Sequence, residues 1–146
     1  MPVFVNNVEI SDDLVHGEMQ HHPAESVEKA RYYAARSLVV QELLVQEAKK
    51  LEILTSESKE EEILAEAVEK LVEREVVIPE ADLDICEKYY DAHKKYFLDK
   101  KTGELLPFFL VKEHIKGYLH TKSLRYAISQ YIEMLAAKSA IEGFKI

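Results

Sequence analysis

The chain has 146 residues, of which 47% are hydrophobic and 32% are charged, so it has enough apolar surface for a core and enough charge to stay in solution. Only four glycines and four prolines are present, which disfavours an all-β fold, because such folds need turn residues about every ten positions. The net charge is −8, with Lys and Arg scattered along the chain, which argues against a nucleic-acid partner and against binding to an anionic membrane surface.

The length suits one compact domain, or two small lobes that share a long helix. No run of about 18 apolar residues is present, so we predict no membrane-spanning segment. The first residues, Met-Pro-Val-Phe-Val-Asn-Asn, lack the basic and apolar regions of a signal peptide. We therefore expect a cytoplasmic location, although a mature secreted form would look the same. Cys86 is the only cysteine, which excludes an internal disulfide and a multi-cysteine zinc site, and we expect it to be a small buried hydrophobe.

Residues 3–10 are predicted to form two short strands around Asn6-Asn7, because Asn tolerates the positive φ that a two-residue hairpin turn requires. Such a hairpin is marginal in water and needs a third strand or a helix to cover it. Ser11 is a good N-cap for a short helix that continues to about Met19. The His-His-Pro sequence that follows breaks this helix, since the residue before a proline avoids helical angles.

Residues 26–50 carry the strongest helical signal, with apolar side chains at three- and four-residue spacing. The middle of this segment is apolar nearly all round, which is typical of a helix at the centre of a core. After a polar break, Ser58 and Glu61 form a capping-box pattern for an amphipathic helix that continues to about Glu75. Pro79 lies beyond its end.

Asp82 is the predicted N-cap of the next helix, whose apolar and aromatic side chains continue along one side as far as Phe97. A turn containing Thr-Gly follows, and Pro107 fits the first turn of a last helix over residues 108–138. Residues 141–146 are predicted to form a short strand, the partner that the hairpin requires. The expected fold class is therefore mainly α, a multi-helix domain with a small β-sheet formed by the N-terminal hairpin and the C-terminal strand.

The polar motifs give little support for an enzyme. His16, His21 and His22, with Glu18 nearby, match no established zinc spacing, and the region is interrupted by a proline, so we expect a solvated helix end rather than a metal site. The chain has no phosphate-binding glycine loop and no serine in a Gly-x-Ser-x-Gly setting. We predict no catalytic residue, no metal and no cofactor.

Aromatic and aliphatic side chains gather on both sides of the short segment that joins the last two predicted helices. They are Tyr89, Tyr90, Tyr96, Phe97, Leu105, Leu106, Phe108 and Phe109. One interpretation is ordinary core packing between neighbouring helices. The other is an exposed patch that binds client segments or a second subunit, since aromatic side chains bury much area with few rotors to freeze.

Three groups of residues carry a resemblance to a known family. The first group is residues 3–11, 21–24 and 34–44, the second is 71–79 and 86–92, and the third is 106–108, 118–119, 130–131 and 140–143. The Tyr-Tyr helix that follows Val-x-Ile-Pro is the most specific part. Together these segments, which cover most of the chain, resemble SurA-type foldases, and most closely the NifM-like parvulin branch linked with nitrogenase maturation.

One departure from that family decides what the resemblance implies. In such foldases a parvulin domain of roughly a hundred residues separates the Tyr-Tyr helix from the C-terminal helix. Here the connection is only residues 98–106, so the catalytic residues of the family have no matching positions. The resemblance implies a single SurA N-terminal-like chaperone domain over residues 1–146, with a helical part at 11–97 and a returning helix and strand at 107–146.

The expected function is ATP-independent, chaperone-like binding of unfolded or partly folded protein segments, without peptidyl-prolyl isomerase activity. The eight aromatic and aliphatic residues above are the candidate client-binding site. The alternatives are a dedicated assembly or maturation partner of one protein, or a module that pairs with itself as a homodimer. An enzyme, either a residual isomerase or a metal-dependent one, is the third hypothesis. No nucleic-acid or membrane partner is expected.

Overall fold

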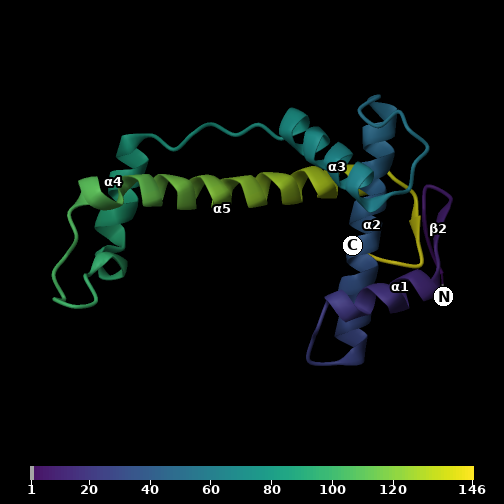
Figure 1. Cartoon of the computed structure of the whole chain (residues 1–146), viewed down its shortest axis with the longest axis horizontal. Helices are drawn as coiled ribbons and strands as arrows, with labels where there is room; N and C mark the ends of the chain where they lie inside the picture. Colours follow the sequence, from purple (N-terminus) through teal and green to yellow (C-terminus); the bar gives the residue numbers. More distant parts are fainter. Residues whose placement is uncertain (1) are drawn as a thin grey trace. The chain divides into compact units, whose positions relative to one another are not determined.

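The computed structural model describes residues 2–146 and shows a mainly helical chain with a small three-stranded antiparallel sheet, which confirms the predicted mainly α fold class (Figure 1). The elements are β1 (Val3–Val5), β2 (Val8–Ile10), α1 (Asp12–Glu18), the 3₁₀ helix η1 (Met19–His21), α2 (Val27–Lys50), α3 (Glu61–Glu75), α4 (Leu83–Ala92), the 3₁₀ helix η2 (Lys94–Phe97), α5 (Phe108–Ala137) and β3 (Ile141–Glu142). Within residues 2–146, no helix combines the length and the apolar character needed to cross a membrane.

The described chain divides into two compact units. Unit 1 comprises the residues up to Val76 together with Ser129–Ile146, and unit 2 is Val77–Ile128. One boundary lies in the extended segment before α4, and the other lies within α5, whose last part belongs to unit 1.

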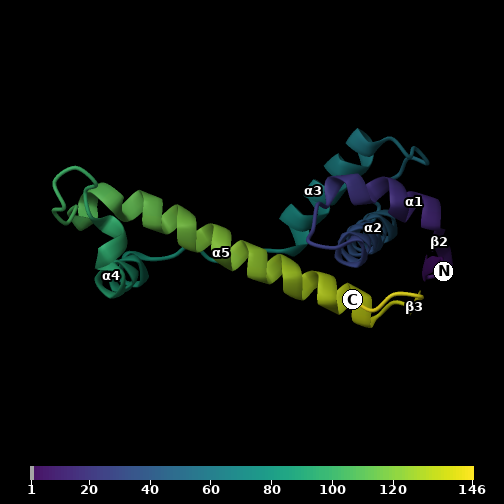
Figure 2. The same ribbon diagram turned by 90° about the horizontal axis from the view of Figure 1, so that it is seen from below.

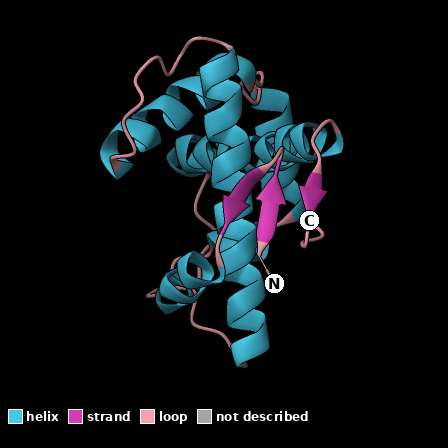
Figure 3. Ribbon diagram, turned by 90° about the vertical axis from the view of Figure 1, so that its right-hand side faces the viewer, coloured by secondary structure: helices cyan, strands magenta, loops and turns pink. Residues whose placement is uncertain are grey.

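The sheet of unit 1 forms as the sequence predicts. Asn6 and Asn7 have φ of 50° and 71°, so the pair makes the two-residue turn that joins β1 to β2. β3 lies on the other edge of β1, with Phe4 opposite Glu142, and gives the strand order β2-β1-β3 (Figure 3). The Asn6 side chain adds to this closure, because its Oδ1 accepts a 2.8 Å hydrogen bond from the Ala140 backbone N–H.

The helices of unit 1 begin at polar caps. The Ser11 hydroxyl accepts a hydrogen bond from the Leu14 N–H at the start of α1, and the Ser26 hydroxyl does the same for Lys29 at the start of α2. Both α1 and α3 pack on α2, which lies at the centre of the unit (Figure 2). One face of α2, including the buried residue Val39, therefore contributes to the core that the sheet and α1 cover.

The predicted capping box at the start of α3 is wrong. The Ser58 hydroxyl accepts a hydrogen bond from the Glu60 N–H, two residues further on, and α3 begins only at Glu61, with Glu60 as an N-cap that makes no side-chain hydrogen bond. The short serine turn satisfies the hydroxyl locally and so delays the helix. The end of α3 at Glu75 agrees with the prediction, and Val76 already has an extended backbone.

In unit 2, Asp82 caps α4 as predicted, because its Oδ1 accepts a 2.8 Å hydrogen bond from the Ile85 N–H. The helix ends at Ala92 rather than continuing to Phe97: His93 leaves the helical conformation, and η2 follows as a tighter turn. The α5 helix begins after Pro107 and is unbroken through Gly117; its 30 residues span about 45 Å. Its observed end at Ala137 is one residue short of the expected one.

Candidate functional site

Unit 2 has its own small core, formed where α4 and η2 meet the first turns of α5. The buried side chains are Cys86, Tyr90, Phe97, Val111 and Ile115. Cys86 is 2% exposed, which confirms that it is a small buried hydrophobe, and burial raises the pKa of its thiol above the usual range despite the opposing effect of Lys116.

Tyr90 ties the loop after η2 to this core. Its hydroxyl donates a 2.6 Å hydrogen bond to the backbone carbonyl of Leu106. Its ring stacks on Phe97, with centroids 5.4 Å apart, and meets Phe108 edge-on at 5.5 Å. The tyrosine thus buries its ring and satisfies its polar end at once, which fixes the entry of the chain into α5.

A second aromatic group flanks the core. The Tyr89 ring stacks on His93 at 4.2 Å and lies 5.6 Å from the Tyr118 ring. The His93 ring in turn stacks on Tyr96. Two effects raise the pKa of Tyr89. Partial burial is the larger effect, and the neighbouring Tyr118 hydroxyl is the next.

The loop between η2 and α5 is held by a tight turn. The Asp99 N–H donates to the Glu104 carbonyl at 2.8 Å, and the Gly103 N–H donates to the Asp99 carbonyl at 2.7 Å. Gly103 has a φ of 73°, a conformation that favours glycine. Next to this turn, the backbones of Leu98 and Leu105 pair in an isolated antiparallel bridge, so their side chains are neighbours.

Around this loop, several large apolar side chains point to solvent instead of into the core. Tyr96 is 63% exposed, Phe109 68% and Leu110 62%, and Leu98 and Leu105 are also exposed. We call these five residues the apolar loop surface. Near these residues, the turn is closed by backbone hydrogen bonds, the Leu106 carbonyl accepts the Tyr90 hydrogen bond, and α5 begins at Phe108.

The structure separates the eight residues that the sequence grouped together. Tyr90 and Phe97 are buried, and Tyr89, Leu106 and Phe108 are half-buried against the same core. The three others, Tyr96, Leu105 and Phe109, are exposed. Core packing therefore accounts for five of the eight, and the binding role stays a prediction for the other three.

Sequence reasoning missed Leu98 and Leu110. The signal for Leu110 is present in the sequence: Phe108, Val111 and Ile115 follow helical spacing toward the core, which leaves Phe109 and Leu110 on another face. Leu98 lies in a loop, where no periodicity indicates the direction of a side chain.

The two units differ strongly in charge. Unit 1 holds 19 Asp and Glu against 10 Lys and Arg, whereas unit 2 holds 8 against 9. The whole net negative charge of the chain therefore comes from unit 1. Unit 2 is close to neutral, and its apolar loop surface is flanked by lysines, one of which, Lys95, lies with its Nζ 5.3 Å from the centre of the Tyr96 ring.

The histidines near the first helix do not come together around a common point. His22 Nε2 lies 3.1 Å from Glu18 Oε1, while His16 and His21 are exposed. Within residues 2–146, no group of three or more His, Cys, Asp or Glu side chains is arranged to hold a metal ion.

Comparison of the chain with models of protein families, with curated proteins and with solved structures gives no match. The resemblance to SurA-type and NifM-like foldases therefore rests on the sequence segments alone.

Proposed function

We propose that this chain is an ATP-independent, chaperone-like protein that holds apolar segments of unfolded or partly folded proteins on the apolar loop surface of unit 2. The observation that supports the proposal is the distribution of exposed apolar side chains. Of the seventeen large hydrophobic side chains exposed in the described part of the chain, ten lie within Val77–Ile128. Five of these ten form the apolar loop surface, and exposed apolar side chains grouped in this way are typical of binding surfaces.

The chemistry of the surface suits weak and tolerant binding. Phe109 and Tyr96 offer aromatic area with few rotors to freeze, and Leu110 adds a flexible aliphatic contact. The near-neutral balance of unit 2 repels neither acidic nor basic segments. Such a surface selects for apolar character and not for one sequence.

The proposal includes no catalytic step, no cofactor and no proline isomerisation. The SurA-like and NifM-like resemblance implies the same kind of activity, and a cytoplasmic location is proposed with it. A proline-isomerisation assay that exceeds the uncatalysed rate would contradict this part of the proposal.

The direct test is suppression of aggregation of a chemically unfolded substrate. We expect suppression at near-stoichiometric amounts of the protein, and a clear loss of suppression for Phe109→Ala and more for Phe109→Ala combined with Leu110→Ala. Tyr126→Ala is the matched control, because Tyr126 lies on the same helix, outside the apolar loop surface, and is 69% exposed against 68% for Phe109. Equal activity of Phe109→Ala and Tyr126→Ala, or no suppression by the unaltered chain, contradicts the proposal.

The second candidate is a dedicated interaction role, in which the same surface pairs with a second copy of this chain or with one folded partner. The exposure of Phe109 and Leu110 side by side at the start of α5 favours it, because such a pair is also suited to a fixed interface. A solution mass of 16.8 kDa at every concentration excludes self-pairing. Capture of one abundant protein instead of many clients favours a dedicated partner.

A further inference from the structure

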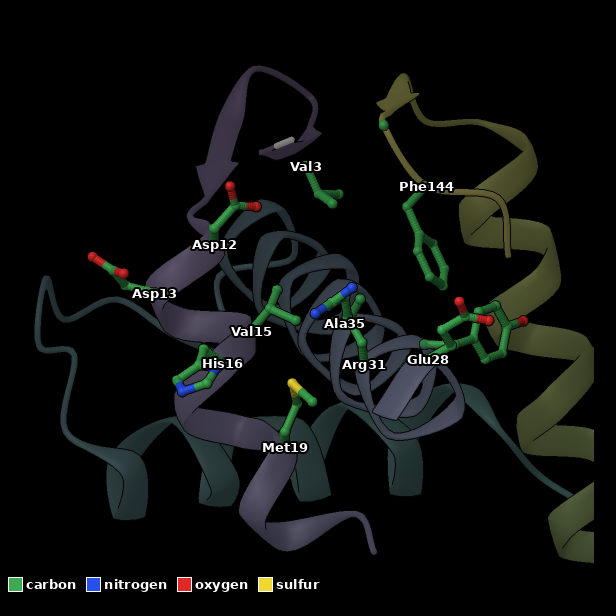
Figure 4. A pocket seen from close by; sticks show the side chains of 12 residues that line it. Val3, Asp12, Asp13, Val15, His16, Met19, Glu28, Arg31, Ala35 and Phe144 are labelled. Atoms are coloured by element: carbon green, nitrogen blue, oxygen red, sulfur yellow. The ribbon is translucent and has the colours of Figure 1, made fainter. Parts of the chain in front are cut away.

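Unit 1 contains a cleft that the function proposed for unit 2 does not use. It lies between α1, the first part of α2 and the segment after β3, and has a volume of about 700 Å³ (Figure 4). Every residue that lines it belongs to unit 1.

One wall of the cleft is apolar, and the guanidinium of Arg31 lies between Val15 and Phe144 in Figure 4. Val3, Val15 and Ala35 are buried parts of the unit 1 core that also face the cleft, and Met19 extends this lining. Phe144 forms the opposite wall, where its ring stacks on Tyr32 with centroids 5.3 Å apart. A cleft of this size accommodates an aliphatic or aromatic side chain of a partner.

The charged side chains that line the cleft are mainly acidic. Asp13 and Glu28 lie on opposite sides of the apolar lining in Figure 4, and Asp12 lies beside Val3. Neither Asp13 nor Glu28 makes an ion pair within the part of the chain that the structure describes. Arg31 is the one Lys or Arg among the lining residues, so carboxylates outnumber it.

Unit 1 as a whole is also negatively charged, since it holds 19 acidic against 10 basic residues. Such an excess attracts positively charged partners and discourages anionic ones. An anionic ligand would gain the Arg31 guanidinium and meet the carboxylates of Asp13 and Glu28. The charge therefore points to a basic partner with an apolar anchor.

We propose that this cleft binds a basic amphipathic protein segment, with an apolar side chain against Val15 and Met19 and flanking Lys or Arg side chains toward Asp13 and Glu28. This is a second binding site, in the other unit, and it does not depend on the apolar loop surface. It adds a charge preference to a chain whose unit 2 has none.

The test uses a short synthetic peptide with one central leucine between lysines that are spaced by serines. We expect it to bind, and we expect the peptide with Glu in place of Lys, and the peptide with Ser in place of Leu, to show no measurable binding. Binding of the Glu peptide with equal affinity overturns the charge argument, and equal binding of the Ser peptide overturns the anchor.

Two double variants distinguish binding at the cleft from attraction by the overall negative charge of unit 1. Asp13→Asn with Glu28→Gln removes two charges at the cleft, and we expect about three- to tenfold weaker binding of the Lys peptide, as for two solvated ion pairs. Glu61→Gln with Glu62→Gln removes the same charge from the first turn of α3, just as Asp13 and Glu28 lie in the first turns of their helices. We expect this control to weaken binding less than about twofold. Equal weakening by the two variants overturns the site.

The position of the peptide is read from the backbone amide resonances of the whole chain. We expect shifts in α1, the start of α2 and residues 143–144, and none in Val77–Ile128. Shifts confined to Val77–Ile128 overturn the proposal. We expect Phe109→Ala to leave this peptide titration unchanged, so a failure here is distinguishable from a failure of the aggregation assay.

Discussion

Unit 1 and unit 2 differ in net charge and in the number of apolar side chains that they expose. Unit 1 is strongly acidic and contains the sheet and the two helices packed on α2, whereas unit 2 is nearly neutral and carries most of the exposed apolar side chains. A protein that displays apolar side chains risks self-association, and net charge elsewhere in the chain opposes it. The excess negative charge and most of the exposed apolar side chains therefore lie in different units.

The two units also differ in how their frameworks are held. Unit 1 closes through strand pairing, with the Asn6 side chain hydrogen-bonded to the Ala140 backbone. All three strands of the sheet belong to unit 1, and unit 2 relies on aromatic packing and on the Tyr90 hydrogen bond to Leu106. If the two frameworks are stabilised independently, a destabilising substitution in one core should leave the other core folded.

The largest expected effect comes from truncating one buried side chain in either core. Leu71→Ala in unit 1 and Ile115→Ala in unit 2 remove side chains that are 0% and 1% exposed, and each should cost about 2–5 kcal/mol of local stability. Hydrogen exchange measures this site by site. We expect Ile115→Ala to speed exchange in Val77–Ile128 and to leave α2 protected, and Leu71→Ala to do the reverse. Uniform loss of protection in both variants would show that the units form one cooperative structure.

A smaller effect is expected at two glycines that differ in surroundings. Gly143 has a φ of 80°, and a Cβ there would lie 2.6 Å from the Pro2 backbone oxygen, so Gly143→Ala should destabilise unit 1 by about 1–3 kcal/mol. Gly117 lies inside α5, and no atom lies within 4 Å of its added Cβ. Gly117→Ala should therefore stabilise the chain by about 0.5–1 kcal/mol. Thermal unfolding of the two variants compares them, and the same sign of change in both would contradict this account.

The smallest effect concerns Tyr131, in the unit 1 part of α5. Its hydroxyl is buried and has no hydrogen-bond partner among residues 2–146, so Tyr131→Phe should stabilise the chain by about 1 kcal/mol at neutral pH. Denaturant unfolding measures it. Tyr126→Phe, which removes an exposed hydroxyl, is the control and should change nothing; a destabilised Tyr131→Phe would mean that the hydroxyl has a partner.

The same tyrosine gives a pH dependence. Desolvation, followed by the charges of Glu47 and Glu75, raises the pKa of Tyr131 to about 12 from an ordinary value of 10.0. The folded state then keeps the proton longer than the unfolded state, so this contribution is complete below pH 10 and is lost as pH rises through about 12. The stability difference between the Tyr131→Phe variant and the unaltered chain should widen over that range, and a constant difference would contradict the shift.

Much of the backbone follows from local signals in the sequence. Ser11 and Asp82 cap the helices that they were predicted to cap, and the Asn6-Asn7 turn joins its two strands. Each of these signals depends on a few adjacent residues. Ser58 failed as a cap because a competing local hydrogen bond to the Glu60 N–H was equally available, and sequence spacing does not decide between the two.

The aromatic cluster could be found from the sequence, but its division into core and surface could not. The α4 helix ends at Ala92, so helical periodicity does not indicate which way the side chains of Tyr96 and Phe97 point. Their opposite environments depend on how the loop returns to Tyr90, a contact across 16 positions of the chain. The cleft of unit 1 was likewise missed, because Val3, Val15 and Phe144 come together only in the folded unit.

The central claim is that clients bind through the apolar loop surface of unit 2. The most direct measurement is the change in backbone amide resonances when an acidic, permanently unfolded client is added to the whole chain, since an acidic client avoids the cleft of unit 1. We predict that the shifts fall on Tyr96, Leu98, Leu105, Phe109 and Leu110 and their neighbours, and that they vanish in Phe109→Ala combined with Leu110→Ala. Unchanged resonances in this region, or identical shifts in that variant, would contradict the account.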